Sequence, residues 1–169
     1  TEAQGYLNQA LKIHPNYKLS YLLLGNSHFY LGNYEQVVTM YRHVLKLDPN
    51  YGEGKRNLGV ALRDYGKFQG EKANNLAGAI SLLEEAVQYL PNDFETYHLL
   101  GVAHGQKGDT QEAITYFKKE IELAPKNASG YFNLGVAYRH AGDELNAKKA
   151  FDQARAIDPD LPQLKAQQQ

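Results

Sequence analysis

Six histidines are the side chains in this sequence best suited to acid–base or metal chemistry, and no cysteine accompanies them. A zinc site needs three or four closely spaced ligands, yet the chain has neither an HExxH motif nor a Cys/His cluster. The stretch GEGK at 52–55 lacks the GxxxxGK[ST] spacing of a phosphate loop, and no nucleophile motif occurs elsewhere. The sequence therefore predicts no catalytic residue, metal or cofactor, and indicates that the chain is not an enzyme.

Composition narrows the class of protein. The chain has 169 residues, of which 43% are hydrophobic and 22% charged, as in a soluble globular domain or a short array of repeats. A net charge of −1 gives no long-range attraction to nucleic acid, and no apolar run is long enough for a membrane span. Because Thr1 is not a natural start, we expect a piece of a longer chain. The compartment stays open, with the cytoplasm slightly favoured.

A repeated pattern organises nearly the whole chain. The segments YLLLGNSHFYLGNYEQVVTMYRHVLKLDP, YHLLGVAHGQKGDTQEAITYFKKEIELAP and YFNLGVAYRHAGDELNAKKAFDQARAIDP share an aromatic residue, Leu-Gly, a second Gly and a closing Pro. Pro125 and Pro159 are 34 residues apart. This pattern resembles the tetratricopeptide repeat, a helix–turn–helix unit of that length.

The resemblance implies an all-α, right-handed superhelical solenoid of antiparallel helix pairs. It also implies the expected divisions: 1–17 as the second helix of a truncated repeat, full repeats at 18–51, 52–93, 94–127 and 128–161, and a tail at 162–169. We expect this tail to be too short for a good capping helix.

The recurring glycines have two expected roles. The first set would let the partner helix approach closely: Gly25, Gly59, Gly101 and Gly135. The second set would end each first helix in a left-handed conformation: Gly32, Gly66, Gly108 and Gly142.

The second repeat carries eight surplus residues, at about 69–76. Apolar residues at Leu76, Ala79, Ile80 and Leu83 keep a helical spacing, so we expect a short loop and then one or two extra turns at the start of the second helix. Added loop length costs little. We therefore favour tolerated surface length over a recognition element.

In the tetratricopeptide family the first helices line the concave side, where partner peptides bind. The resemblance thus implies a protein–protein interaction scaffold that takes a peptide or helical segment. The groove residues expected from helical periodicity are Leu19, Leu22, Asn26, Phe29, Tyr30, Arg56, Arg63, His98, Phe132, Arg139 and His140. Among them, Phe29, Tyr30 and Phe132 are the expected apolar anchors, and the three arginines are expected to pair with acidic or backbone groups. Small residues at Val102 and Gly105 leave room in the middle of the groove.

Two alternatives stay open for the apolar residues at the start of the chain. Uncovered terminal helices, with Tyr6, Leu7, Ala10 and Leu11 at one end, favour self-association into a larger assembly as a second function. Plain packing is a third. One subset of the family binds the terminal carboxylate of a peptide with a set of basic and asparagine residues. Only Asn26 and Asn57 match that pattern here, so we do not expect this chain to bind a terminal carboxylate in that way.

Two sets of polar residues in the helices remain. His28 and His104 occupy the aromatic position that Tyr138 fills, which indicates packed and hydrogen-bonded rings. Glu120 stands where the other second helices have a small apolar residue. We expect its carboxylate to meet a partner in the fourth repeat rather than a bound chain.

Overall fold

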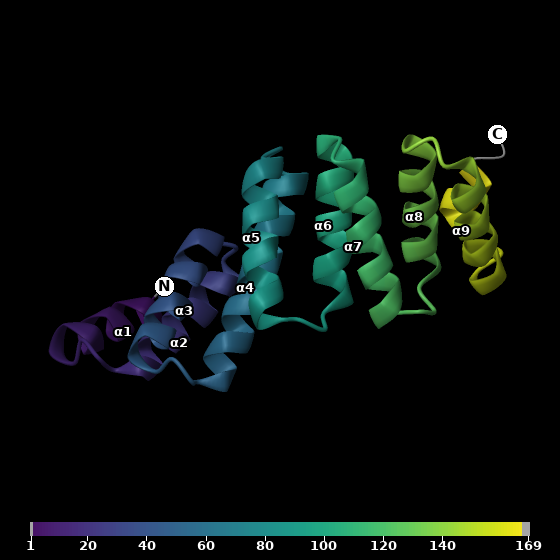
Figure 1. The fold of residues 1–169 in the computed structure, drawn as a ribbon. Coiled ribbons are helices and arrows are strands. Elements are labelled where there is room, and N and C mark those ends of the chain that lie inside the picture. The colour runs from purple at the N-terminus through teal and green to yellow at the C-terminus, as the bar shows by residue number, and fades with distance from the viewer. Residues whose placement is uncertain (1, 167–169) are drawn as a thin grey trace.

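The computed structural model describes residues 2–166, with side chains through residue 164, and these residues form helices with no strand. Figure 1 shows the helices stacked side by side in chain order. Their bounds are α1 Glu2–Ile13, α2 Lys18–Tyr30, α3 Tyr34–Leu47, α4 Gly52–Glu71, α5 Leu76–Tyr89, α6 Phe94–Lys107, α7 Thr110–Leu123, α8 Ala128–His140, α9 Glu144–Ile157 and α10 Pro162–Ala166. The predicted all-α solenoid of antiparallel helix pairs is confirmed.

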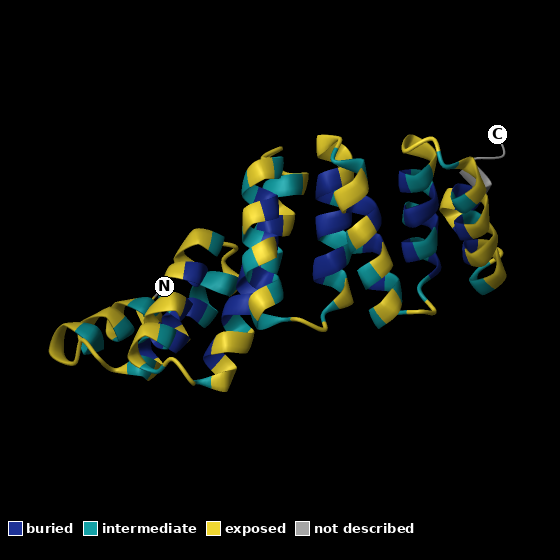
Figure 2. Ribbon diagram, in the orientation of Figure 1, coloured by how far each residue is buried: buried dark blue, intermediate teal, exposed yellow. Residues whose placement is uncertain are grey.

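The core runs along the stack as a series of clusters between neighbouring helices. Each second helix packs against its own first helix and against the first helix of the next repeat; α3, for example, contacts both α2 and α4. In the first of these clusters Val37 and Val44 of α3 meet Leu58 and Leu62 of α4, all at most 1% exposed. Figure 2 shows the buried residues on the helix faces that meet and the exposed ones on the outer faces. Apolar burial between adjacent units is thus what stabilises the stack.

Three repeats share one close helix–helix contact. A Cβ at Gly101 would lie 2.5 Å from the Phe117 ring, and one at Gly135 would lie 2.7 Å from the Phe151 ring. Gly25 faces Tyr41 in the same way, and in every case the aromatic residue follows the glycine by 16 positions. These glycines are required because any side chain would push the two helices of the hairpin apart.

The second repeat has two glycines packed against its second helix. A Cβ at Gly66 would lie 2.8 Å from Leu83, whereas Gly59 faces Tyr89 and Leu90 at the far end of α5. Gly66 is buried inside α4 and therefore does not end a helix, so that prediction is wrong. Gly32, Gly108 and Gly142 do have the predicted left-handed φ, between 70° and 94°. The second repeat thus has two close-approach glycines, Gly59 as predicted and Gly66 in addition.

The surplus residues lengthen the first helix of the second repeat. α4 has 20 residues, against 13 or 14 in α2, α6 and α8, while α5 has the same 14 residues as the other second helices. The predicted extra turns at the start of α5 are therefore wrong. Asn74, with a φ of 51°, turns the chain after α4, and the Asn75 side chain accepts from the Gly78 N–H at 3.1 Å to start α5.

The C-terminal tail also differs from expectation. Residues 162–166 form α10, and Leu161 and Leu164 are 6% and 4% exposed against Ala128, Phe132 and Ala154. Two leucines, rather than a long helix, are enough to cover this end of the fourth repeat. Residues 167–169 lie outside the described part of the chain. Within residues 2–166, no helix combines the length and apolar character needed to cross a membrane.

Candidate interaction groove

The first helices border a row of three hollows, one at each junction between repeats. The N-terminal pocket, about 320 Å³, lies between α2 and α4 and is lined by Asn26, Phe29, Tyr41, Arg56, Asn57 and Val60. The middle pocket lies between α4 and α6, and the C-terminal pocket lies between α6 and α8. Together these three pockets form what we call the first-helix groove.

The N-terminal pocket is rich in hydrogen-bond donors. Burial, followed by the influence of Tyr30 and Glu53, raises the pKa of Tyr41 to about 12, so its hydroxyl keeps its proton. That hydroxyl donates to Oδ1 of Asn26 at 2.6 Å, which leaves the Asn26 amide nitrogen free to donate. Arg56 is exposed on the same wall and makes no ion pair with any described residue. The pocket can therefore accept a carboxylate or carbonyl group.

The middle pocket is almost closed, with a volume of about 40 Å³. Leu83 and Leu99 are among its lining residues, whereas α8 has Asn133 at the position that matches Leu99. The groove is therefore roomy at its two ends and filled between them.

α4 borders its two pockets with separate stretches of helix. Asn57 and Val60 line the N-terminal pocket, while residues 66–71 line the middle one. In α6, by contrast, Val102 lines the pockets on both sides. The long α4 thus shifts the later repeats along its axis by about two turns, on the order of 10 Å. In Figure 1 the helices before α4 lie lower than those after it and run at an angle to them.

The C-terminal pocket measures about 320 Å³ and is mostly apolar. Gly101, Val102 and Gly105 form its α6 wall, with Gln106 at the edge, and His140 contributes from α8. Val102 and Gly105 do leave space, but at the C-terminal end of the groove rather than in its middle, where we expected it from the sequence.

Two predicted groove residues belong to the core instead. Leu22 is 5% exposed and packs with Val37 and Tyr41, while Phe132 is 9% exposed, with its ring 5.5 Å from that of Phe151. Helical periodicity placed both on an open wall, which is wrong, because the second helix of the same repeat covers them. Leu19 and Tyr30 do lie exposed on α2, at 43% and 88%.

Arg63 joins α4 to the start of α6. Its guanidinium lies 3.0 Å from Asp64, 3.4 Å from Asp93 and 3.2 Å from Glu95, and the side chain is 18% exposed. Burial lowers the pKa of Arg63, but Asp64, Glu95 and Asp93 together outweigh it and raise that pKa. Its hydrogen-bonding capacity is therefore used within the protein.

His98 faces a buried carboxylate. Its Nδ1 lies 3.1 Å from Oε2 of Glu120, which is 0% exposed, and Asn127 donates to Oε1 of Glu120 at 2.8 Å. A Cβ at Gly130 would lie 2.9 Å from Oε1, so this glycine makes room for the carboxylate. Glu120 thus lies against Gly130 of the fourth repeat, as predicted, but its polar partners His98 and Asn127 belong to the third repeat.

Arg139 of α8 and the neighbouring residues of α9 lie at the C-terminal end of the stack, beyond the three pockets. The Arg139 guanidinium lies 5.5 Å from the centre of the Phe151 ring. Beside it, α9 carries Lys148 and Arg155, where α7 has Ile114 and Ile121. This end of the stack therefore presents charge where the junction between α7 and α8 is apolar.

Tyr41 and Phe117 were missed as pocket-lining residues, although each follows a close-approach glycine by 16 positions, a spacing visible in the sequence. The histidines do not form a metal site: no group of three or more potential ligands occurs in the described part of the chain. His104 instead stacks on Tyr116 and lies 3.1 Å from Asp109.

Comparison with known proteins agrees with the helix pairing. A family model described as the tetratricopeptide repeat matches residues 71–128 and 98–162, and a second such model matches 19–51. The chain belongs to the tetratricopeptide repeat family. The family matches leave out residues 52–70, nearly all of α4, which is the helix that departs from the repeat. No curated protein matches the chain significantly.

Solved structures of tetratricopeptide proteins share the fold. YrrB, described as having an unusual peptide-binding site, is 23% identical, with a TM-score of 0.68 over 98% of this chain and 81% of its own. MamA from Desulfovibrio magneticus RS-1 is 24% identical, with a TM-score of 0.61 over 95% and 86%. PilW, a type IV pilus biogenesis factor, is 20% identical, with a TM-score of 0.54 over 89% and 66%. The fold of this chain supports a general role as a protein–protein interaction scaffold.

Proposed function

We propose that this chain is a non-catalytic scaffold that binds a peptide or helical segment of a partner protein in the first-helix groove. The observation that carries the proposal is the pair of open pockets, each about 320 Å³, between consecutive first helices. Each combines apolar walls with side-chain amides, a combination suited to a peptide with alternating side-chain and backbone contacts. A micromolar Kd, equivalent to about −8 kcal/mol, would be ordinary for such a groove.

Arg56 is the basic residue that we assign to the ligand. It is exposed, unpaired among the described residues and adjacent to Asn26 and Asn57. Arg63 and Arg139 are already engaged, by carboxylates and by an aromatic ring. A partner with a carboxylate or an exposed carbonyl next to an apolar residue fits this arrangement.

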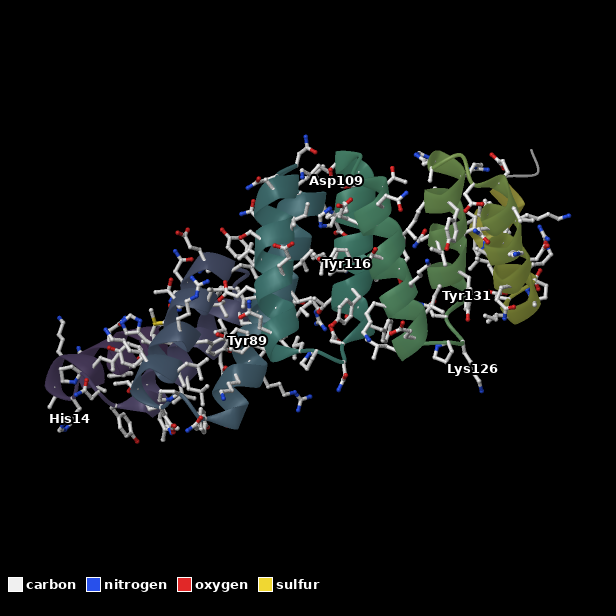
Figure 3. All side chains as sticks on the ribbon, in the orientation of Figure 1. His14, Tyr89, Asp109, Tyr116, Lys126 and Tyr131 are labelled. Atoms are coloured by element: carbon white, nitrogen blue, oxygen red, sulfur yellow. The ribbon has the colours of Figure 1, made fainter. Side chains whose placement is uncertain are left out.

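The test is selection of peptides from a random displayed library on the immobilised chain, followed by fluorescence anisotropy with the selected peptides. Arg56→Ala should weaken binding at least fivefold. Lys126→Ala is the matched control, because Lys126 is exposed at the turn between α7 and α8 (Figure 3). Failure to select any peptide, or equal binding by Arg56→Ala, would contradict the proposal.

A second candidate function is self-association through the N-terminal helices. Seven of the large hydrophobic side chains that are exposed lie between residues 6 and 31: Tyr6, Ile13, Tyr17, Leu19, Leu23, Tyr30 and Leu31. These side chains all come from α1, α2 and the turns beside α2, and exposed apolar surface of this size is typical of protein interfaces. Sedimentation velocity over a hundredfold concentration range tests this candidate. A dimer that dissociates in Tyr30→Asp would support it, and a monomer at every concentration would exclude it.

A further inference from the structure

Gly105 has no structural reason to be glycine. It lies in helix α6, its φ is not among the positive values, and a Cβ there would meet only the Ala113 methyl, at an ordinary distance of 3.8 Å. Gly101, one turn earlier, differs because its Cβ would collide with Phe117. Glycine weakens a helix relative to alanine. What Gly105 preserves is therefore the space beside it, the C-terminal pocket.

Comparison along the groove shows how other side chains fill the matching position. Four residues after the close-approach glycine, α2 has Phe29 and α8 has Arg139, whose guanidinium covers the Phe151 ring. In α4 the residue four positions after Gly66 is Gly70, but there the pocket, which Leu83 and Leu99 also line, measures only about 40 Å³. Only the α6–α8 junction combines an absent side chain with an open, mostly apolar hollow in the described residues.

The lining of the C-terminal pocket specifies an uncharged occupant. No Asp, Glu, Lys or Arg contributes to it, and the one titratable side chain is His140 at the end of α8. A charged group placed there would lose hydration without gaining an ionic partner. Gln106 and Asn133 add side-chain amides, which can bond to the backbone of a peptide whose side chain enters the pocket.

We propose that the C-terminal pocket is the specificity pocket of the groove and takes one large aliphatic or aromatic side chain of a partner peptide. The proposal rests on the proposed function and adds the chemistry of the residue recognised. A volume of about 320 Å³ is at the lower end of the range for small-ligand pockets, so it suits one side chain with its backbone rather than a helix. Gly105 contributes to this pocket by having no side chain that would fill it.

The experiment uses capped amino acids as probes and amide chemical shifts as the readout. N-acetyl-leucine and N-acetyl-phenylalanine methylamides should shift the resonances of Gln106 and Asn133 saturably, and the aspartate and lysine analogues should not. Gly105→Leu should weaken binding of the leucine probe at least tenfold, because leucine is a good helix former that fills the pocket. Gly70→Leu, the matched control in the filled pocket, should leave it within twofold.

Several outcomes would overturn the proposal: no saturable shift with either apolar probe, equal shifts with the charged probes, or unchanged binding in Gly105→Leu. Shifts of Gln106 that depend on protein concentration without a probe would also overturn it, because a second copy would then occupy the pocket. Library peptides whose binding depends on Arg56 but not on Gly105 would leave the groove assignment intact and exclude the specificity pocket. The two proposals therefore fail separately.

Discussion

Oε2 of Glu120 and Nδ1 of His98 lie 3.1 Å apart and tie α7 to α6 beneath the first-helix groove. The carboxylate is 0% exposed and also accepts from Asn127, the N-cap residue of α8, so it ties α7 to the start of α8. Its other neighbour, Gly130, has no side chain to collide with it. Removing one member of such a buried hydrogen-bonded group leaves its partners unsatisfied, which is costly.

Glu120→Ala is expected to destabilise the chain by about 2–3 kcal/mol, because Asn127 loses its acceptor and a cavity forms. Gly130→Ala alone is also expected to destabilise it, since the methyl would lie 2.9 Å from the carboxylate. Combined, the two changes should cost less than their sum, because the methyl then occupies space that the carboxylate has left. Urea denaturation followed by circular dichroism measures this coupling. Simple additivity would show that Gly130 does not serve Glu120.

The two arginines of α4 should behave differently. Arg63→Ala is expected to lower the free energy of unfolding by about 1–3 kcal/mol, because Asp64 and Asp93 lose a half-buried partner. Arg56→Ala should change it by less than about 0.5 kcal/mol, as at an exposed site without partners. A variant with both arginines replaced is therefore not a clean test of binding, because the Arg63 change alone lowers stability. Equal stabilities of the two single variants would contradict the ion-pair assignment.

The continuity of α4 can be tested with proline. Gln69→Pro is expected to cost about 3 kcal/mol, because residue 69 lies inside helix α4 and proline cannot donate its backbone bond. Gln69→Ala should cost at most about 1 kcal/mol, because it keeps the helix and loses only the exposed hydrogen bond that Asn75 donates to Oε1 of Gln69. Thermal unfolding of both variants gives the comparison. A proline variant as stable as the parent would mean that the segment is a loop.

Acid should weaken the chain in a defined range of pH. Hydrogen bonds from Lys18 lower the pKa of Asp48, those from Lys107 and His104 lower that of Asp109, and those from Asn146 lower that of Asp143, each below the usual 3.8. A lowered carboxyl pKa contributes stability above the unfolded-state value, and this stability is lost as the pH falls through the folded-state value. The urea midpoint should therefore decrease below about pH 3.8.

A matched variant isolates one of these groups. Asp143→Asn keeps a side-chain oxygen that can accept from the Asn146 N–H but cannot titrate. Its urea midpoint should fall less between pH 5 and pH 3 than that of the parent chain. An identical decrease would show that Asp143 does not contribute to acid sensitivity.

The repeat pattern predicted most of the fold because its residues act locally. Gly101 and Phe117, separated by 16 positions, set the pairing of one hairpin, and their equivalents recur in the sequence. The second repeat could not be placed in this way, because Gly59 and Gly66 both match a family position. Both lie inside α4 and face α5, Gly59 at Tyr89 and Leu90 and Gly66 at Leu83, and these contacts depend on how far α4 continues.

The site was harder to predict because periodicity gives a helix face but not the partner. Arg63 lies on a first helix as expected, yet Asp93 and Glu95 reach it from the next repeat, about 30 residues away in the chain. Leu22, on a helix face like that of the other candidates, is covered by α3. The sequence showed that Gly105 is small, but its proposed role in a specificity pocket depends on the volume of the pocket beside it, which only the structure gives.

The long α4 sets a geometric demand on any ligand that would occupy both open pockets. Because the two halves of the groove are out of line by about two helical turns, a straight extended strand cannot follow it from end to end. An offset on the order of 10 Å between the two halves corresponds to about three residues of extended chain. A partner that contacts both halves therefore needs two short anchoring motifs joined by a pliable spacer, and peptides shortened within that spacer would reach one pocket at a time.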